Sequence, residues 1–239
     1  SQSEHLFQIE QDGKYGYIDQ HGRVRINPVF STADAFSEGL ALVRNGDKGF
    51  FIDTAGKAVS GKLYEDARPF SEGLAAFEQQ GKEGYIDMHE RVVIPPIYDE
   101  AGPFFEGRAA VRREGQFFVI NTKGKAVYTA KIIGEELDCT SYHEGMAFVQ
   151  NGKEYSCIDL SGKEVFRVPF PVLESFSEGL ALALTSIGPG FISIGKEGVP
   201  IGPTPTAHGY LNTKGILQIS GKYAEARSFS DGLAAVRMG

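Results

Sequence analysis

Two short phrases recur in a fixed order along this chain, and this repetition constrains the fold more than any other feature. The first phrase joins an aromatic residue to an acidic residue, a glycine and an alanine, at residues 36–41, 70–75, 104–109, 142–147, 176–181 and 229–234. The second is a variant of Tyr-Ile-Asp-x-x-Gly, at residues 17–22, 51–56, 85–90, 119–124, 157–162 and 210–215. Most copies lie about 34 residues apart, a spacing typical of tandem arrays of one supersecondary unit.

Each repeat is predicted to consist of short strands joined by tight turns. An apolar run such as residues 40–43 follows the first phrase, and it is too short for a helix and bounded by turn residues. A polar turn with glycine leads into a second strand such as residues 16–19, because glycine supplies the positive φ that hairpin turns need. The same conformation is expected at the glycines of the first phrase, to which we assign a structural role: Gly39, Gly73, Gly107, Gly145, Gly179 and Gly232.

A third strand, such as residues 23–26 or 91–94, is predicted after the second phrase. Pro28, Pro95, Pro96 and Pro169 follow these strands, and we expect them to end the pairing because proline has no N–H to donate. A connector then leads to the next repeat and carries apolar residues in register. One repeat cannot bury these residues alone, whereas stacked repeats can.

The chain is therefore predicted to be all-β, with three-stranded antiparallel meanders of about 34 residues stacked into an open, curved or twisted array. A closed propeller-like ring is the alternative, and we rank it second because these repeats are short for propeller blades. Residues 1–239 are predicted to form one domain of about six repeats, with an irregular insert near residues 186–206.

At these residues the chain resembles the WG-repeat family of bacterial proteins, also called KWG repeats. The similarity rests on residues 13–19 (GKYGYID), on residues 92–99 (VVIPPIYD) and on the recurring FSEGLA phrase, and it covers nearly the whole chain. The signature tryptophan is absent, and its position holds Tyr15, Gly49, Glu83, Phe117 and Tyr155. The resemblance implies a binding or scaffolding module and carries no catalytic residue over.

Two columns of acidic residues invite a metal-binding or acid–base interpretation. The first comprises Glu38, Glu72, Glu106, Glu144, Glu178 and Asp231. The second comprises Asp19, Asp53, Asp87, Asn121, Asp159 and Asn212. One carboxylate before each glycine favours turn capping over calcium, which gathers several oxygens on one ion within a short loop. The second column admits asparagine, which fits turn hydrogen bonding rather than ionised catalysis. We predict no metal and no cofactor.

The histidines and cysteines are also predicted to have ordinary roles. His5, His21, His89, His143 and His208 lack the spacing of zinc ligands and are expected to be solvated. Cys139 stands in the alanine column of the connector, and Cys157 replaces an aromatic residue of the second phrase. Both are expected to behave as small apolar residues with free thiols, and a disulfide between them is the alternative.

Charge and motifs argue against several classes of function. The net charge is −7 and no long basic run occurs, which disfavours nucleic-acid binding. No apolar stretch approaches the roughly 18 residues of a membrane span. The P-loop, the dinucleotide-binding and the nucleophile-elbow motifs are absent, so we predict a protein that is not an enzyme. The first residues do not resemble a signal peptide, and an envelope or periplasmic location and a cytoplasmic one both stay open.

Two functions remain. The first is a non-catalytic module that binds a protein or peptide partner across its repeats, because solenoid surfaces offer extended contacts. The second is a carbohydrate- or envelope-binding module that uses Tyr15, Phe117 and Tyr155 as an exposed aromatic strip. Large aromatic residues at regular strand positions more often pack in a core, so exposure of these three would distinguish the two.

Overall fold

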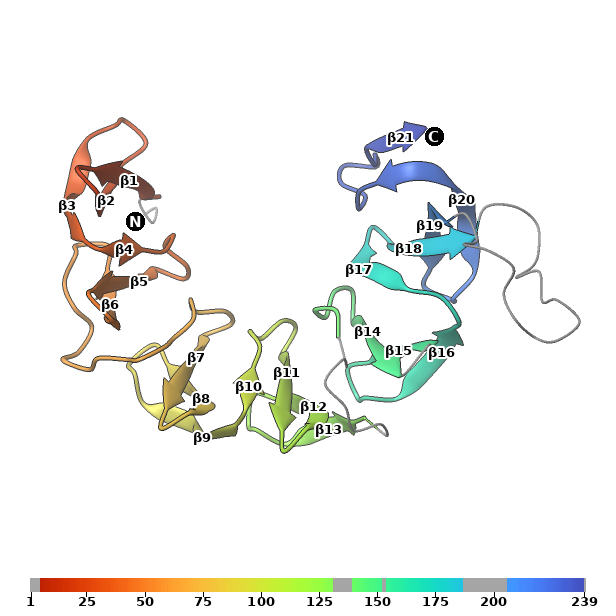
Figure 1. The fold of residues 1–239 in the computed structure, drawn as a ribbon, viewed down its shortest axis with the longest axis horizontal. Coiled ribbons are helices and arrows are strands. Elements are labelled where there is room, and N and C mark those ends of the chain that lie inside the picture. Colours follow the sequence, from red (N-terminus) through yellow and green to blue (C-terminus); the bar gives the residue numbers. More distant parts are fainter. Residues whose placement is uncertain (1–4, 131–138, 152–153, 187–205, 239) are drawn as a thin grey trace, which may run out of the picture. The chain divides into compact units, whose positions relative to one another are not determined.

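The computed structural model describes residues 5–130, 139–151, 154–186 and 206–238, and in these residues all the regular structure is β. The chain divides into two compact units, which we call the N-terminal half (Ser1–Ala126) and the C-terminal half (Val127–Gly239). The strands pair antiparallel in sheets that follow one another in chain order, as Figure 1 shows for each half. The predicted all-β repeat architecture is confirmed, while the choice between an open array and a closed ring stays a prediction.

The N-terminal half contains four repeats, each with its own sheet. Their strands are β1 (Phe7–Gln11), β2 (Lys14–Ile18) and β3 (Val24–Phe30); β4 (Thr32–Ala33), β5 (Leu40–Asn45) and β6 (Lys48–Asp53); β7 (Leu74–Gln79), β8 (Lys82–Asp87) and β9 (Val92–Tyr98); and β10 (Glu100–Ala101), β11 (Arg108–Arg113), β12 (Gln116–Asn121) and β13 (Ala126–Thr129). The division between the halves falls at the first residue of β13.

The C-terminal half contains a three-stranded sheet and a five-stranded sheet. The first comprises β14 (Met146–Asn151), β15 (Glu154–Asp159) and β16 (Glu164–Val168). The second comprises β17 (Val172–Ser177), β18 (Leu180–Ser186), β19 (Thr206–Asn212), β20 (Leu217–Ala226) and β21 (Val236–Met238). The predicted insert near residues 186–206 lies almost entirely outside the described residues. In the described segments, no helix is long and apolar enough to cross a bilayer.

Two-residue loops join β1 to β2, β5 to β6, β7 to β8 and β11 to β12. In the first repeat Gln11 pairs with Lys14 across Asp12 and Gly13, whose φ angles are +52° and +70°. Two successive positive φ values define the type I′ turn, whose twist matches that of the flanking strands. The hairpin turns predicted from the glycine pattern are thus present.

The prolines do not all end the third strands, which corrects one expectation. β3 continues through Pro28, and β9 continues through Pro95 and Pro96. In both, the register against the second strand shifts near the proline, which marks a bulge where no ladder bond from proline is needed. Only Pro169 directly follows the end of its strand, β16.

The second repeat departs from the three-stranded plan. Between Asp53 and Tyr64 the chain makes only isolated bridges to β6, from Ala58 to Ile52 and from Tyr64 to Gly49. Ser60 and Lys62 stand where the first repeat has Ile26 and Pro28, so the apolar pattern of a third strand is missing here. A polar segment replaces that strand at the contact with the third repeat.

Core clusters join consecutive repeats rather than filling single ones. In one cluster Tyr17 and Ile26 of the first repeat pack with Val43 and Ile52 of the second. The tyrosine hydroxyls of the second phrase bond the connectors: Tyr17 donates to the carbonyl of Asp34 at 2.6 Å and Tyr85 to that of Gly102 at 2.7 Å. Stacking therefore buries the apolar columns, and the tyrosines fix each connector against its own sheet.

Candidate functional site: a hydroxyl-lined groove

The acidic residues of the first phrase connect neighbouring repeats. Glu38 accepts the backbone N–H groups of Glu72 and Gly73 at 2.8 Å each, one on each carboxylate oxygen. Glu72 accepts those of Glu106 and Gly107 at 2.6 and 2.7 Å. We call this contact the carboxylate clasp. The predicted capping role is therefore correct in kind, but the capped turn belongs to the next repeat.

The C-terminal half has a related contact, in which, among the described residues, the carboxylate accepts only the glycine N–H. Glu144 accepts the N–H of Gly179 at 2.9 Å, and Glu178 accepts that of Gly232 at 2.9 Å. The second of these bridges turns that are 54 residues apart in sequence. The clasp is thus a general joint between neighbouring repeats within each half.

The second acidic column caps its own turns with a single oxygen. The Oδ1 atom of each residue accepts two backbone N–H groups, from the residues two and four positions later. Asparagine offers the same oxygen as aspartate, which explains Asn121 and Asn212. The structural interpretation of this column is confirmed.

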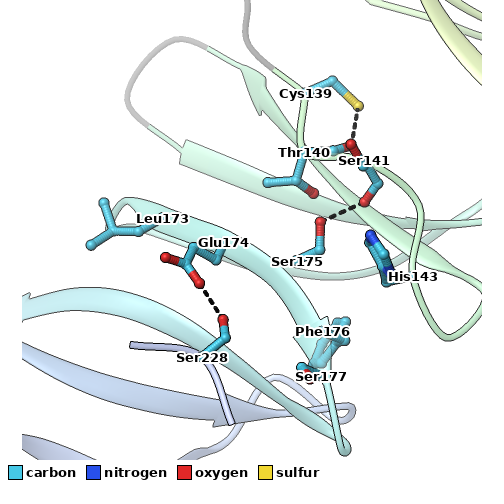
Figure 2. Close-up of a pocket in the computed structure, with 10 residues that line it drawn as sticks. All are labelled: Cys139, Thr140, Ser141, His143, Leu173, Glu174, Ser175, Phe176, Ser177 and Ser228. Atoms are coloured by element: carbon cyan, nitrogen blue, oxygen red, sulfur yellow. Dashed lines mark hydrogen bonds between the residues drawn. The ribbon is translucent and has the colours of Figure 1, made fainter. Parts of the chain in front are cut away.

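The clasps and serine hydroxyls hold successive connectors beside one another. Ser37 donates its hydroxyl to the carbonyl of Phe70 at 2.7 Å, and Ser177 donates to that of Phe229 at 2.8 Å. Within the C-terminal half, Ser175 also donates to the carbonyl of Ser141 at 2.6 Å. Two connectors of that half therefore run next to each other, with Ser228 at the end of the third beside them (Figure 2).

A groove of about 540 Å³ opens along these connectors. Its lining is rich in hydroxyls and comprises Cys139, Thr140, Ser141, His143, Leu173, Glu174, Ser175, Phe176, Ser177 and Ser228. Such a volume lies in the range of ligand sites in proteins. The groove is our candidate functional site.

One repeat position gives the groove its polar character. Ser141, Ser175 and Ser228 all lie one residue before the aromatic of the first phrase. In the N-terminal half the same position holds Ala35, Pro69 and Pro103, which offer no side-chain hydroxyl. The alanine column also changes, because Ala33, Ala67 and Ala101 are buried whereas Leu173 is 44% exposed. The groove thus reflects substitutions confined to the C-terminal half.

The groove holds both satisfied and available polar atoms. The Ser228 hydroxyl donates to Oε2 of Glu174, and Figure 2 shows the second carboxylate oxygen of Glu174 pointing away from Ser228. Within the described residues this second oxygen and the hydroxyl of Ser141 have no partner. A ligand in the groove can therefore bond an acceptor with negative charge and an exposed hydroxyl without displacing an existing contact.

A family model described as the WG containing repeat matches residues 15–48, 50–82, 84–117 and 209–239, together more than half of the chain. This chain belongs to the WG-repeat family. None of the curated proteins compared with it matches.

Solved structures share the fold of this WG-repeat chain at low sequence identity. Kluyveromyces marxianus Hsv2 has a TM-score of 0.52 at 12% identity, over 75% of this chain and 72% of that chain. A variant named KlHsv2 with loop 6CD replaced by a Gly-Ser linker has a TM-score of 0.51 at 11% identity, over the same shares. A eukaryotic initiation factor has a TM-score of 0.56 at 10% identity, over 94% of this chain and 65% of that chain. These likenesses show a β-repeat fold alone.

The aromatic residues at the WG tryptophan position are buried or partly buried. Phe117 is buried, at 5% exposed, in β12. Tyr15 of β2 and Tyr155 of β15 are partly buried and pack against two different core clusters. None of the three lines the groove.

The glycine of the WG motif has a role that the sequence interpretation missed. A Cβ on Gly16 would lie 2.4 Å from the carbonyl oxygen of Ile26, and one on Gly84 would lie 2.5 Å from that of Ile94. The bulged third strand approaches the second strand at these points, and only glycine leaves room for it. The second repeat, which lacks a third strand, has Phe50 at this position.

The six turn glycines of the first phrase have φ between +72° and +84°. A Cβ on any of them would meet open space, so backbone conformation alone favours glycine there. In the described residues no group of three His, Cys, Asp or Glu side chains could hold a metal ion.

The two cysteines are free. Cys157 is buried, and burial raises the pKa of its thiol to about 12. Cys139 was expected in an apolar column, but it is only half-buried, lines the groove and donates to the carbonyl of Thr140 at 3.1 Å.

Proposed function

We propose that this WG-repeat protein is a non-catalytic interaction module that binds an extended peptide segment along the groove of its C-terminal half. The observation that carries the proposal is the recurrence of serine at one repeat position, in Ser141, Ser175 and Ser228, beside the free oxygen of Glu174. A row of polar groups spaced by stacked connectors suits a chain that itself repeats donors and acceptors along its length.

The charge of the protein indicates which peptides would bind. The net charge is −7, and the available oxygen of Glu174 adds a negative acceptor inside the groove. Both features favour a peptide with lysine or arginine, through steering toward the protein and a charge-assisted hydrogen bond in the groove. We therefore propose a basic peptide partner.

The non-catalytic part of the proposal rests on the groups that accept hydrogen bonds from the groove serines. Ser175 donates to a backbone carbonyl, which cannot take up its proton, and the carboxylate that accepts the Ser228 hydroxyl is a weak base for activating it toward a substrate. A nucleophilic serine needs an effective base within hydrogen-bond reach. These hydroxyls are better placed to hold the groove and to contact a ligand.

The carbohydrate alternative has less support from the geometry. Its aromatic strip would need Tyr15, Phe117 and Tyr155 on a common exposed surface, yet Phe117 is buried and the two tyrosines contact separate cores. Sugar rings stack on exposed aromatic faces, and in the groove Phe176 is 2% exposed. We therefore rank it second.

The test uses a blocking variant with a matched control. Ser141→Trp fills the groove at an exposed position, and Ala35→Trp adds the same side chain at the equivalent exposed position of the second repeat. A random peptide library is panned on the purified 239-residue protein, and affinities of enriched peptides are measured by fluorescence polarisation. We expect Ser141→Trp to weaken binding at least tenfold, Ala35→Trp to leave it unchanged, and Glu174→Gln to lower the preference for lysine and arginine.

Two outcomes contradict the proposal. Either no peptide binds the parent protein more tightly than Ser141→Trp, or Ala35→Trp weakens binding as much as Ser141→Trp does. Retention of a defined sugar on a glycan array, with loss of that signal in Tyr155→Ala, would replace the peptide with the carbohydrate alternative.

A further inference from the structure

Glu90 breaks the pattern of the second phrase. The position holds glycine in the other repeats, at Gly22, Gly56, Gly124, Gly162 and Gly215. Glu90 keeps the left-handed conformation of those glycines, with φ of +58°, and its carboxylate-bearing side chain is 1% exposed. A buried ionisable side chain in a strained conformation, at a position that normally has no side chain, calls for a specific partner.

The partner is the missing third strand of the second repeat. At comparable joints the turn glycine packs on an apolar side chain of the preceding repeat: a Cβ on Gly56 would lie 3.3 Å from Ile26, and one on Gly124 would lie 3.3 Å from Ile94. Facing Glu90, the equivalent position holds Ser60. A small polar residue therefore replaces isoleucine where a large polar residue replaces glycine, and an apolar joint becomes a polar one.

Three residues of the second repeat surround Glu90. The Ser60 hydroxyl bonds Oε2 of Glu90, and the Lys62 ammonium bonds the backbone carbonyl of Glu90. The Tyr64 ring packs edge-on against Phe51 and Phe77, which holds its hydroxyl inside the joint. Among the described residues, two buried side-chain oxygens have no hydrogen-bond partner: the hydroxyl oxygen of Tyr64 and Oε1 of Glu90.

The two charge states of Glu90 differ in what they place in this buried joint. Ionised Glu90 only accepts hydrogen bonds, whereas its neutral form carries an O–H that can donate to the oxygen of Tyr64. Burial raises the pKa of Glu90, and the positive charge of Lys62 opposes that change. Burial and then the charge of Glu90 raise the pKa of Tyr64, so the tyrosine stays neutral. On its own turn the nearest charges are Asp87 and Arg91, which pair with each other at 2.7 Å.

We infer that Glu90 is a protonation-dependent lock on the joint between the second and third repeats. Neutral Glu90 bonds Ser60 and Tyr64 and holds the strandless segment 54–64 against the third repeat. Ionised Glu90 leaves a charge inside the buried joint, where the Lys62 ammonium bonds its backbone carbonyl and no cation of the described residues forms a salt bridge with its carboxylate, so this segment opens as the pH rises.

The sign of the effect follows from linkage. A carboxyl whose pKa is higher in the folded than in the unfolded protein stabilises the folded protein. This stabilisation is fully present at a pH below the pKa of the unfolded state, about 4.3 for glutamate, and it is lost as the pH rises through the pKa of the folded state. Between the two values the folding equilibrium constant falls about tenfold per pH unit from this group alone. Surface carboxylates in ion pairs have a lowered pKa in the folded protein, so their contribution to stability increases as the pH rises.

The experiment compares Glu90→Gln, which stays neutral at every pH, with the parent protein. The control is Glu114→Gln, because Glu114 is exposed and has a nearly equal φ of +54°. Urea midpoints are measured from pH 4 to 9, and hydrogen exchange is followed in residues 54–64. We expect the parent to lose stability relative to Glu90→Gln as the pH rises, with faster exchange in this segment, and Glu114→Gln to show no such trend.

A second variant keeps the test informative if Glu90→Gln folds poorly. Glu90→Gly combined with Ser60→Ile restores the apolar joint of the other repeats and should remove the pH trend in exchange of residues 54–64. The inference is overturned if the difference between parent and Glu90→Gln is constant over this pH range. It is also overturned if the parent gains stability relative to Glu90→Gln as the pH rises, because Glu90 is then ionised in the folded protein and paired with Lys62.

Discussion

The carboxylate clasp couples a strained residue to a bond between repeats. Glu38, Glu72, Glu106, Glu144, Glu178 and Asp231 all have φ between +49° and +55°. An L-residue loses roughly 1–2 kcal/mol in this left-handed conformation. A carboxylate that accepts two backbone N–H groups can offset that loss, since hydrogen bonds to charged groups stabilise by about 1.5–3 kcal/mol, and less where solvent screens them.

Glu72→Gly separates these two contributions. Glycine removes the strain but also the clasp to Glu106 and Gly107, so we expect a net loss of about 1 kcal/mol in the free energy of unfolding. The control is Asp12→Gly in a hairpin turn, where the residue has the same conformation without a clasp and where glycine should stabilise. Urea denaturation measures the free energy of unfolding of both variants. Equal stabilisation by the two substitutions would show that the clasp contributes nothing to stability.

Gly73→Ala tests the conformation of the turn itself. The φ of Gly73 is +77° and a Cβ there would meet open space, so the expected loss of about 1–2 kcal/mol comes from backbone strain alone. Gly61→Ala is the matched control, because Gly61 also faces open space and has no positive φ. If thermal unfolding shows the same midpoint for both variants, strain at this turn is not what selects glycine.

At the level of elements, the bulged third strand determines what the second strand can carry. The bulge brings backbone atoms of β3 and β9 against Gly16 and Gly84, and the repeat that lost this strand tolerates Phe50 instead. The prolines of the third strand lie in the same bulge, where the ladder does not need their missing N–H. Glycine is thus tied to the bulge rather than to the third strand as such, because Phe118 and Ser156 stand at this position in the repeats of β13 and β16.

Gly84→Ala should therefore be more damaging than a substitution at a turn. The Cβ would lie 2.5 Å from a backbone carbonyl oxygen, and we expect a loss of about 2–3 kcal/mol from overpacking against atoms that cannot rotate away. At Gly49 the nearest atom is a side-chain methyl group of Leu42 at 3.0 Å, which can move. Chemical denaturation of Gly84→Ala and Gly49→Ala should rank them in this order, and the reverse ranking would refute the role given to the bulge.

For the whole molecule, we propose that the chain unfolds as one cooperative unit, as the single-domain prediction implies. Buried Cys157 in the C-terminal half reports on this, because its thiol reacts only when that half opens. In a Cys139→Ala background, a destabilising change in the N-terminal half such as Glu72→Gly should speed labelling of Cys157 by a thiol reagent. An unchanged labelling rate, with Glu72→Gly still destabilised in urea, would mean that the two halves open independently.

The sequence indicated the fold well because its signals are local and repeated. Hairpin glycines, Asp-x-x-Gly turns and apolar columns each act within one repeat or between neighbours, so every copy repeats the same information. The target of the Glu38 carboxylate was missed because it lies in the next repeat, and the need for Gly16 was missed because it depends on a bulge. The groove arises from Ser141, Ser175 and Ser228, whose significance emerges only when the connectors are seen side by side.

The clasp also bears on how such a gene can lengthen. The third repeat carries both parts of the joint: its Glu72 carboxylate bonds the following turn, and its Glu72 and Gly73 N–H groups bond the preceding Glu38. An in-frame duplication of a repeat with both parts therefore introduces a complete clasp. The bond from Glu178 to Gly232 spans 54 residues, whereas that from Glu38 to Gly73 spans 35, so the joint also tolerates added sequence between turns. The clasp therefore lets copy number change by whole repeats, whereas the polar joint between Ser60 and Glu90 requires its two repeats to stay neighbours.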